Sequence, residues 1–230
     1  MWSIGDVKAK GKAAFLGNYW KSVLAAIILN SLLAVNSSVT SNHSDSDEWV
    51  QQLLAGLTPE EVVALAKIVL VALGAMFVIS LLLKIFLFNP LKVGCYRFFK
   101  RNIEEGKAPL GEIKTGFGGY GHTFITLFLS DLFLCLWTLL FIIPGCIKSY
   151  SYRMVPYILK DNPELSATEV ITKSREMMNG HKWRTFLYDL SFIGWYLFGI
   201  VTFGLAMALF VAPYKHNADA ALYIELSKKQ

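Results

Sequence analysis

The sequence predicts an all-α polytopic membrane protein, with six transmembrane helices arranged as three helical-hairpin repeats. Composition supports this fold class, because 54% of the 230 residues are hydrophobic and only 17% are charged. A soluble domain usually carries about 25% charged residues. The mean hydropathy of +0.45 points the same way. A repeated motif and the distribution of basic residues supply the remaining evidence.

The repeated motif relates the beginning of the chain to its C-terminal third. Residues 17–22 (GNYWKS) match residues 180–185 (GHKWRT), and a weaker third copy begins at Gly121. Each copy precedes an apolar run, so we expect each to open a helical hairpin. The predicted units cover residues 3–105, 109–160 and 166–227 of a single membrane domain, 1–230. The motif residues are Gly17, Trp20, Gly121, His122, Gly180, His181 and Trp183.

Apolar runs set the predicted crossings, because a helix needs about 20 apolar residues to span the hydrocarbon core of a bilayer. The fourth run is short and would reach only about 21 Å at 1.5 Å per residue. It must therefore begin within the preceding span, tilt, or face protein. The predicted crossings are residues 19–35, 62–88, 123–143, 146–159, 186–203 and 205–226.

Proline and glycine mark the expected turns and kinks. Pro144 with Gly145, and Gly204, are predicted at the outer turns of the second and third hairpins. The prolines Pro90, Pro156 and Pro213 are expected near the inner ends of the descending helices.

Loop charge predicts the orientation. Residues 36–61 contain no Lys or Arg and several acids, whereas residues 92–114 and 160–184 are rich in basic residues. Because cytoplasmic loops are enriched in Lys and Arg, the first segment is predicted to be extracytoplasmic and the other two cytoplasmic. Both termini are then cytoplasmic. The net charge of +5 is accounted for by these loops, so we expect no nucleic acid partner.

Two segments are predicted to be amphipathic helices at the inner membrane surface. One begins at Ser166 and the other at Ser3, and each has an acid three residues later, as in a capping box. Basic residues lie opposite their apolar faces, as expected beside anionic lipid. Such helices could sense lipid or dock a partner, or simply anchor each hairpin. Trp20 and Trp183 are expected at headgroup level.

Charged residues within the apolar runs are the candidate functional groups, since charges are costly in lipid. Counted along the helices, Asp131 lies at a depth comparable to Arg153, and Asp189 at a depth comparable to Lys215. We therefore predict two buried pairs, Asp131–Arg153 and Asp189–Lys215. They could form an ion or proton relay, or they could be structural pairs that hold the hairpins together.

The sequence offers little sign of catalysis. His122 and His181 lack any zinc-binding spacing, and a helix-start or headgroup role is the preferred interpretation. The glycine-rich residues 116–121 lack a phosphate-binding pattern and suggest a hinge. The three cysteines share no metal-ligand spacing and are interpreted as free thiols. We therefore predict no catalytic residues, no cofactor and no metal site.

Several stretches resemble an uncharacterised bacterial integral-membrane family, domain of unknown function 975. They are residues 141–145, 147–148, 150–152, 154–159, 161–163, 174–184, 190–195, 213–214 and 221–223. The resemblance is expected to cover most of the chain. It implies a multi-pass protein of the bacterial cytoplasmic membrane and supplies no activity.

Two function classes follow, with a third more remote. The first is a non-enzymatic scaffold, accessory subunit or envelope-stress factor that acts through protein or lipid partners. The alternative is a small oligomeric transporter or channel that uses the buried Asp, Arg and Lys charges. The third is a membrane-embedded lipid enzyme. The lipid bilayer is the expected partner, with a membrane protein or a second copy of the chain as a further one.

Overall fold

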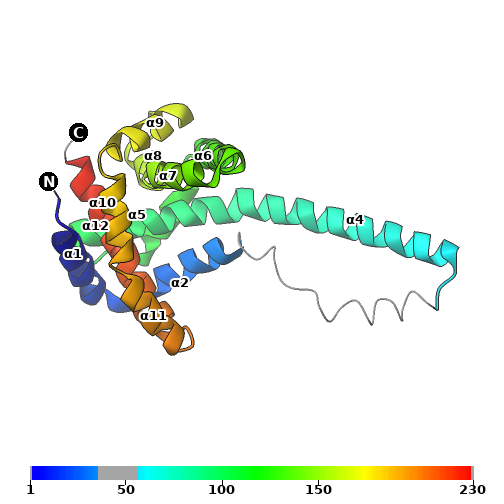
Figure 1. The fold of residues 1–230 in the computed structure, drawn as a ribbon, viewed down its shortest axis with the longest axis horizontal. Coiled ribbons are helices and arrows are strands. Elements are labelled where there is room, and N and C mark those ends of the chain that lie inside the picture. Colours follow the sequence, from blue (N-terminus) through cyan, green and yellow to red (C-terminus); the bar gives the residue numbers. More distant parts are fainter. Residues whose placement is uncertain (1, 36–55, 229–230) are drawn as a thin grey trace.

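The computed structural model describes residues 2–35 and 56–228, which form helices and no strand, so the predicted all-α class is confirmed for this part of the chain (Figure 1). The α-helices are α1 (Ile4–Gly17), α2 (Tyr19–Val35), α4 (Pro59–Leu83), α5 (Asn89–Glu105), α6 (Tyr120–Leu140), α7 (Ile142–Tyr152), α8 (Val155–Asp161), α9 (Ala167–Met177), α10 (Lys182–Leu190), α11 (Ile193–Val201) and α12 (Ala212–Ser227). The described part also contains the π-helices η1 (Lys84–Phe88) and η3 (Met207–Val211) and the 3-10 helix η2 (Leu110–Phe117).

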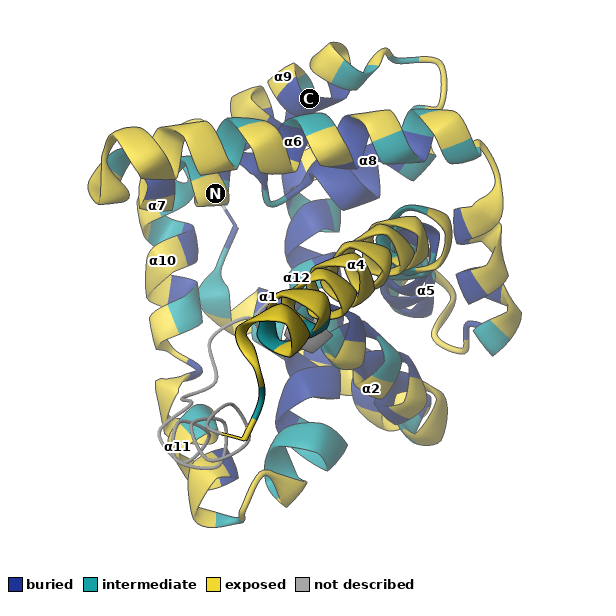
Figure 2. Ribbon diagram, turned by 90° about the vertical axis from the view of Figure 1, so that its right-hand side faces the viewer, coloured by how far each residue is buried: buried dark blue, intermediate teal, exposed yellow. Residues whose placement is uncertain are grey.

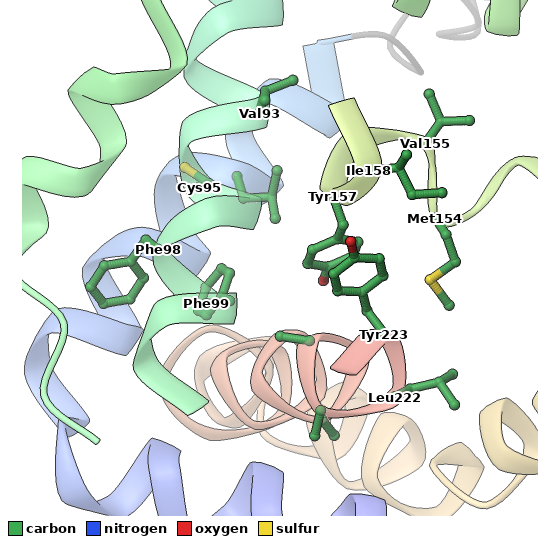
Figure 3. Packing of buried hydrophobic residues seen from close by; sticks show 14 of the residues in the cluster. Val93, Cys95, Phe98, Phe99, Met154, Val155, Tyr157, Ile158, Leu222 and Tyr223 are labelled. Atoms are coloured by element: carbon green, nitrogen blue, oxygen red, sulfur yellow. The ribbon is translucent and has the colours of Figure 1, made fainter. Parts of the chain in front are cut away.

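Helix α12 lies at the centre of a buried helical body and packs against α1, α2 and α5. Small residues permit close contact with α1, since a Cβ added at Gly11 would lie 2.5 Å from the Cα of Ala218. On another side of α12, Tyr223 stacks on Tyr157 of α8 with ring centroids 4.9 Å apart (Figure 3). The core thus joins the two ends of the chain.

Sequence signals for helix starts correspond to real caps. The backbone N–H of Glu61 donates to the Thr58 hydroxyl at 3.4 Å, and the Thr58 N–H donates to the Glu61 carboxylate at 2.8 Å. The Ser166 N–H and hydroxyl both donate to the Glu169 carboxylate at 2.7 Å. Each cap satisfies polar groups that a helix terminus would otherwise leave unpaired.

Two prolines stand directly after π-helical turns. Pro90 follows η1 and Pro213 follows η3, each as the second residue of the next α-helix. A proline has no N–H to give the carbonyl four residues before it, and its ring crowds that carbonyl. The local i→i−5 pattern accommodates this: the Asn89 N–H donates to the Lys84 carbonyl, and that of Ala212 to Met207.

Three arms project from the body in different directions, and each contains a strongly apolar helix (Figures 1 and 2). The first arm is α4, which has no buried residue and continues through η1 into α5. The second is the α6–α7 hairpin, which runs across the direction of α4. The third is formed by α10 and α11, which also run across α4.

Two helices of the described part are long and apolar enough to cross a membrane, the continuous helix Pro59–Glu105 and Tyr120–Leu140. Six crossings are therefore not shown. The fourth predicted crossing, 146–159, is broken at Arg153 and Met154, and α8 beyond the break is buried in the body. The sixth, 205–226, includes α12, whose Lys215 and Asn217 are buried against protein. Residues 36–55 of the predicted outer loop lie outside the described residues.

The two outer turns are not equivalent, which corrects one prediction. Gly204 does occupy a turn, with φ of 82°. Gly145, by contrast, lies inside α7, and the reversal falls at the extended Phe141. Pro144 fits the first turn of α7 because the N–H it lacks would have no partner there. Gly145 instead lets α7 approach α6, since an added Cβ would meet the Thr138 hydroxyl at 2.5 Å.

Candidate functional site

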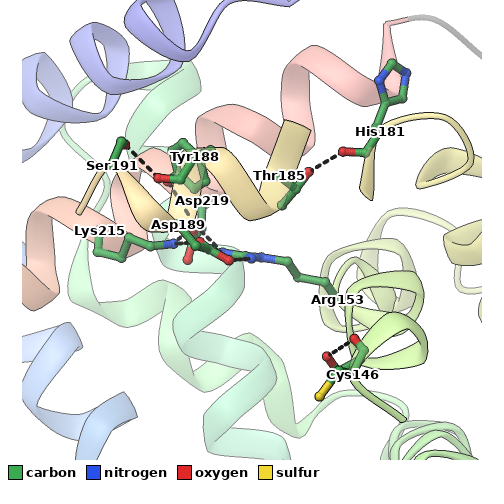
Figure 4. Close-up of polar contacts among 10 residues, drawn as sticks. Cys146, Arg153, His181, Thr185, Tyr188, Asp189, Ser191, Lys215 and Asp219 are labelled. Carbon is green, nitrogen blue, oxygen red and sulfur yellow. Dashed lines mark hydrogen bonds and ion pairs between the residues drawn. The ribbon is translucent and has the colours of Figure 1, made fainter. Parts of the chain in front are cut away.

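A cluster of four charged side chains joins three parts of the fold (Figure 4). Arg153 comes from the break between α7 and α8, Asp189 from α10, and Lys215 and Asp219 from α12. Segments far apart in the sequence thus converge where the α10 arm meets the body.

Arg153 is the centre of this cluster. Its Nη1 donates to Asp189 Oδ2 at 2.6 Å and its Nη2 to Asp189 Oδ1 at 3.0 Å. Nη2 also donates to Asp219 Oδ1 at 2.9 Å. A bidentate interaction of this kind fixes the relative orientation of the two side chains as well as pairing their charges.

Lys215 completes the network. Its Nζ lies 2.9 Å from Asp189 Oδ1 and 2.5 Å from Asp219 Oδ1. The Tyr188 hydroxyl also donates to Asp219 Oδ1, at 2.9 Å. Two cations and two carboxylates balance, so the cluster is neutral overall and its members are bonded to one another. Loss of any one member of such a network should destabilise the fold, because the remaining charges would be left partly buried without their partner.

Aromatic rings enclose the lysine. The Lys215 Nζ lies 4.5 Å from the centroid of the Tyr188 ring and 5.3 Å from that of Phe192. The Nζ of Lys8, in α1, lies 4.5 Å from the centroid of the same Phe192 ring and donates to the Ser191 carbonyl at 3.1 Å. These cation–π contacts and the hydrogen bond connect α1, the C-terminal end of α10 and α12, so the arrangement has a structural role.

The structure brings together three of the four predicted charges. Asp189 and Lys215 do form an ion pair. The predicted pair of Asp131 with Arg153 is wrong, because Arg153 binds Asp189 and Asp219 instead. Asp219 was not predicted, although Lys215 and Asp219 have the i,i+4 spacing that places two residues on one helix face.

Asp131 lies elsewhere, on an exposed part of α6. It lines a cavity of about 360 Å³ together with Lys84 and Asn89 from the α4–α5 helix. Asp131 therefore belongs to the junction of α6 with the long helix, and not to the Arg153 cluster.

A buried amide network that the sequence analysis missed holds α1, α2, α5 and α12 together. The Asn102 Nδ2 donates to Asn217 Oδ1 at 2.8 Å and to the Ala14 carbonyl at 3.0 Å. Asn18 Nδ2 donates to Asn102 Oδ1 at 2.8 Å. Asn18 directly follows the motif residue Gly17, and its place in the repeated motif was the only sequence feature that could have indicated a structural role for it.

The motif residues lie at or near helix ends, but only some of them occupy matching positions. Trp20 and Trp183 are each 71% exposed near the start of a helix. Gly180 has φ of 74° and leads into His181, the N-cap of α10, while Gly17 ends α1. Gly121 and His122 lie within the first turn of α6. The two tryptophans therefore correspond, whereas the three glycines do not share one local structure, and the three-repeat architecture stays a prediction.

Among the described residues, no His, Cys, Asp and Glu side chains form a group of three or more that could hold a metal ion. Cys95 is buried, and Cys135 and Cys146 are exposed free thiols.

Comparison with known proteins identifies a family match for the C-terminal part. Residues 139–230 match the model of the family described as "Protein of unknown function (DUF975)". The resemblance predicted from the sequence is confirmed for this segment, which contains the whole Arg153 cluster. The match begins at residue 139 and so covers less than half of the chain. No curated protein and no solved structure matched.

Proposed function

We propose that this chain is a non-enzymatic membrane protein that acts as a scaffold or accessory subunit through protein or lipid partners. The observation that carries the proposal is the division of the molecule into arms with exposed apolar helices and a body that contains an internally neutralised charge cluster. The arms offer surface that water would not solvate favourably. The Arg153 cluster holds an arm to the body and leaves no charge of that cluster unbalanced.

Helix α4 is the principal membrane anchor in this proposal. Lys67 and Lys84 bracket residues 68–83, which carry no charge and rise about 24 Å. This is close to the hydrocarbon thickness of about 30 Å, and lysine side chains near either end can extend toward the headgroups. With Glu60 and Glu61 at its outer end and the basic residues of α5 at its inner end, α4 fits an orientation with the termini cytoplasmic.

The directions of the arms affect how many times the chain can cross the membrane. A flat bilayer perpendicular to α4 would leave the α6–α7 and α10–α11 arms lying along its surface. We propose that α2 and α4 cross and that the other two arms insert in the cytoplasmic leaflet as hairpins. Helices α7 and α11 support this, since their 11 and 9 residues are too few for a crossing. The rival is the six-crossing arrangement, which also has both termini cytoplasmic.

Cysteine labelling in intact cells distinguishes these topologies. On a cysteine-free background, Phe141→Cys and Phe203→Cys report the tips of the two hairpins, Glu60→Cys is the outer control and Lys173→Cys the inner control. We expect an impermeant reagent to label only position 60. Labelling of positions 141 and 203 from outside would establish six crossings, and labelling of position 173 would overturn the orientation.

The scaffold function is tested by crosslinking and flux together. We expect a membrane protein or lipid to crosslink stoichiometrically to the full chain. Proteoliposomes that contain the chain should show no flux. Flux that is abolished by Asp131→Asn or Asp189→Asn would favour the transporter alternative and overturn the scaffold.

A further inference from the structure

A basic pocket and an apolar groove adjoin each other on the two sides of α7. The pocket, of about 270 Å³, lies between α7, α9 and the start of α10, and Lys148, Arg175 and Lys182 line it. The groove, of about 380 Å³, lies between α7 and α10, and Ile147, Tyr150 and Phe186 are among its lining residues. Lys182 borders both cavities, so the basic pocket and the apolar groove are direct neighbours.

The three cations of the pocket are not neutralised by protein. None of them has a carboxylate oxygen within 4 Å among the described residues, although Glu176 also lines the pocket. The Lys148 Nζ is held instead 4.5 Å from the centroid of the Trp137 ring. Three like charges gathered around a cavity favour an anion there.

The groove supplies the complementary apolar surface. Trp183 is 71% exposed and stacks on Phe186 with ring centroids 5.2 Å apart. Ile147 on the facing helix is 49% exposed. An exposed tryptophan beside basic residues is typical of the headgroup region of a membrane.

We propose that this combined site binds an anionic phospholipid, with the lipid phosphate among Lys148, Arg175 and Lys182 and an acyl chain along the groove. The inference rests on the membrane placement proposed above and names the class of lipid. Charge selects an acidic headgroup over a zwitterionic one, because the pocket has three cations against one nearby carboxylate. The groove selects a lipid over free phosphate, because a phosphate ion alone would leave the apolar surface uncovered.

Native mass spectrometry of the full chain in detergent tests the site, with phosphatidylglycerol titrated as the probe. Phosphatidylcholine and glycerol 3-phosphate are the comparison ligands. The test variant combines Lys148→Gln, Arg175→Gln and Lys182→Gln. The matched control combines Lys12→Gln, Lys107→Gln and Lys114→Gln, three exposed lysines whose loss changes the net charge equally.

We expect the pocket variant to lose at least about tenfold in affinity for phosphatidylglycerol, as removal of several charge-assisted hydrogen bonds would cause. The control variant should lose less than about twofold. Trp183→Ala should weaken phosphatidylglycerol binding and leave any glycerol 3-phosphate binding unchanged. Circular dichroism establishes that each variant keeps its helices.

Three outcomes would overturn the site. Equal loss in the pocket and control variants would mean diffuse charge attraction. Unchanged binding in the pocket variant would place the lipid elsewhere. Glycerol 3-phosphate binding as tightly as the lipid would mean an anion site without a lipid. Extraction of the wild-type chain from membranes by alkaline carbonate would instead contradict the proposed function, so the two failures are distinguishable.

Discussion

Arg153 shows how one side chain can join distant parts of a fold. Its guanidinium bonds to carboxylates on α10 and α12 from a position where two helices meet. The guanidinium geometry suits this role, since it presents several donors in one plane. Lys215 reaches the same two carboxylates from within α12.

A double-mutant cycle on this cluster should show strong coupling. We expect Arg153→Gln and Asp189→Asn each to lower the free energy of unfolding by about 1–3 kcal/mol, because each leaves a partly buried opposite charge with fewer partners. The double variant should cost less than the sum of the singles. Chemical denaturation in mild detergent measures all four states.

The control for this cycle is the Lys10–Glu225 pair, which is more exposed. Its coupling should stay below about 1 kcal/mol, as is usual at the surface. Additive losses for Arg153 and Asp189 would show that the two side chains do not stabilise each other.

Glu169 makes the cap of α9 sensitive to pH. Hydrogen bonds from the Ser166 hydroxyl and backbone N–H lower the pKa of Glu169 below its usual value of 4.5. A lowered pKa in the folded state adds stability that is complete above the unfolded-state pKa and is lost as the pH falls through the folded-state pKa. We therefore expect the Tm advantage of the wild type over Glu169→Gln to shrink below about pH 4.3.

Thermal unfolding of both proteins between neutral and acidic pH measures this advantage. The exposed Glu164→Gln is the control and should show a smaller difference. A difference between wild type and Glu169→Gln that stays constant across the range would contradict the ionised cap.

Sequence reasoning at this scale identified residue types better than partners. Asp189 and Lys215 were paired by depth, and the structure joins them. Arg153 was assigned to Asp131 because both were assumed to lie on straight, antiparallel helices. The break at Met154 sends α8 into the body, so that assumption failed at this position.

At the scale of elements, the contact between α5 and η2 depends on two glycines. A Cβ added at Gly94 would overlap the carbonyl oxygen of Ile113, and one at Gly116 would overlap that of Pro90. Backbone atoms meet directly here, so neither side can adjust by rotating a side chain.

Gly94→Ala should therefore destabilise the protein by about 1–3 kcal/mol, the usual cost of overpacking. Alanine is the better helix former by about 1 kcal/mol, which offsets only part of this loss. Gly111→Ala is the control, because no atom lies within 4 Å of its added Cβ. Chemical denaturation should show a loss at 94 and little change at 111; equal effects would contradict the close contact.

Helix starts were the elements that the sequence predicted best. Thr58 and Ser166 cap helices as expected, because a cap depends on residues only three positions apart. The Gly145 turn was wrong because glycine also serves close packing, and a sequence does not distinguish these two roles. The π-helical turns before Pro90 and Pro213 were likewise not anticipated.

At the scale of the whole molecule, the sequence predicted an all-α chain with long apolar segments but not how those segments are directed. The six predicted crossings assumed that apolar runs align along one membrane normal. In the structure, α4 and the two hairpin arms point in different directions (Figure 2). Direction depends on contacts between residues distant in the chain, such as those of α5 with α12 and of α6 with α5, α8 and α9.

The π-helical turn at Lys84–Phe88 affects the rotational orientation of α4 relative to α5 and the body. Residues of an α-helix succeed one another by about 100° around the axis, so one additional residue in a turn shifts the phase of everything beyond it by that amount. The apolar α4 and the packed α5 are therefore one continuous rod with two different angular settings. The five residues of η1 therefore set the rotation of α4 about its axis relative to α5. This rotation determines which side of α4 faces α6 while α5 keeps its contacts with the body.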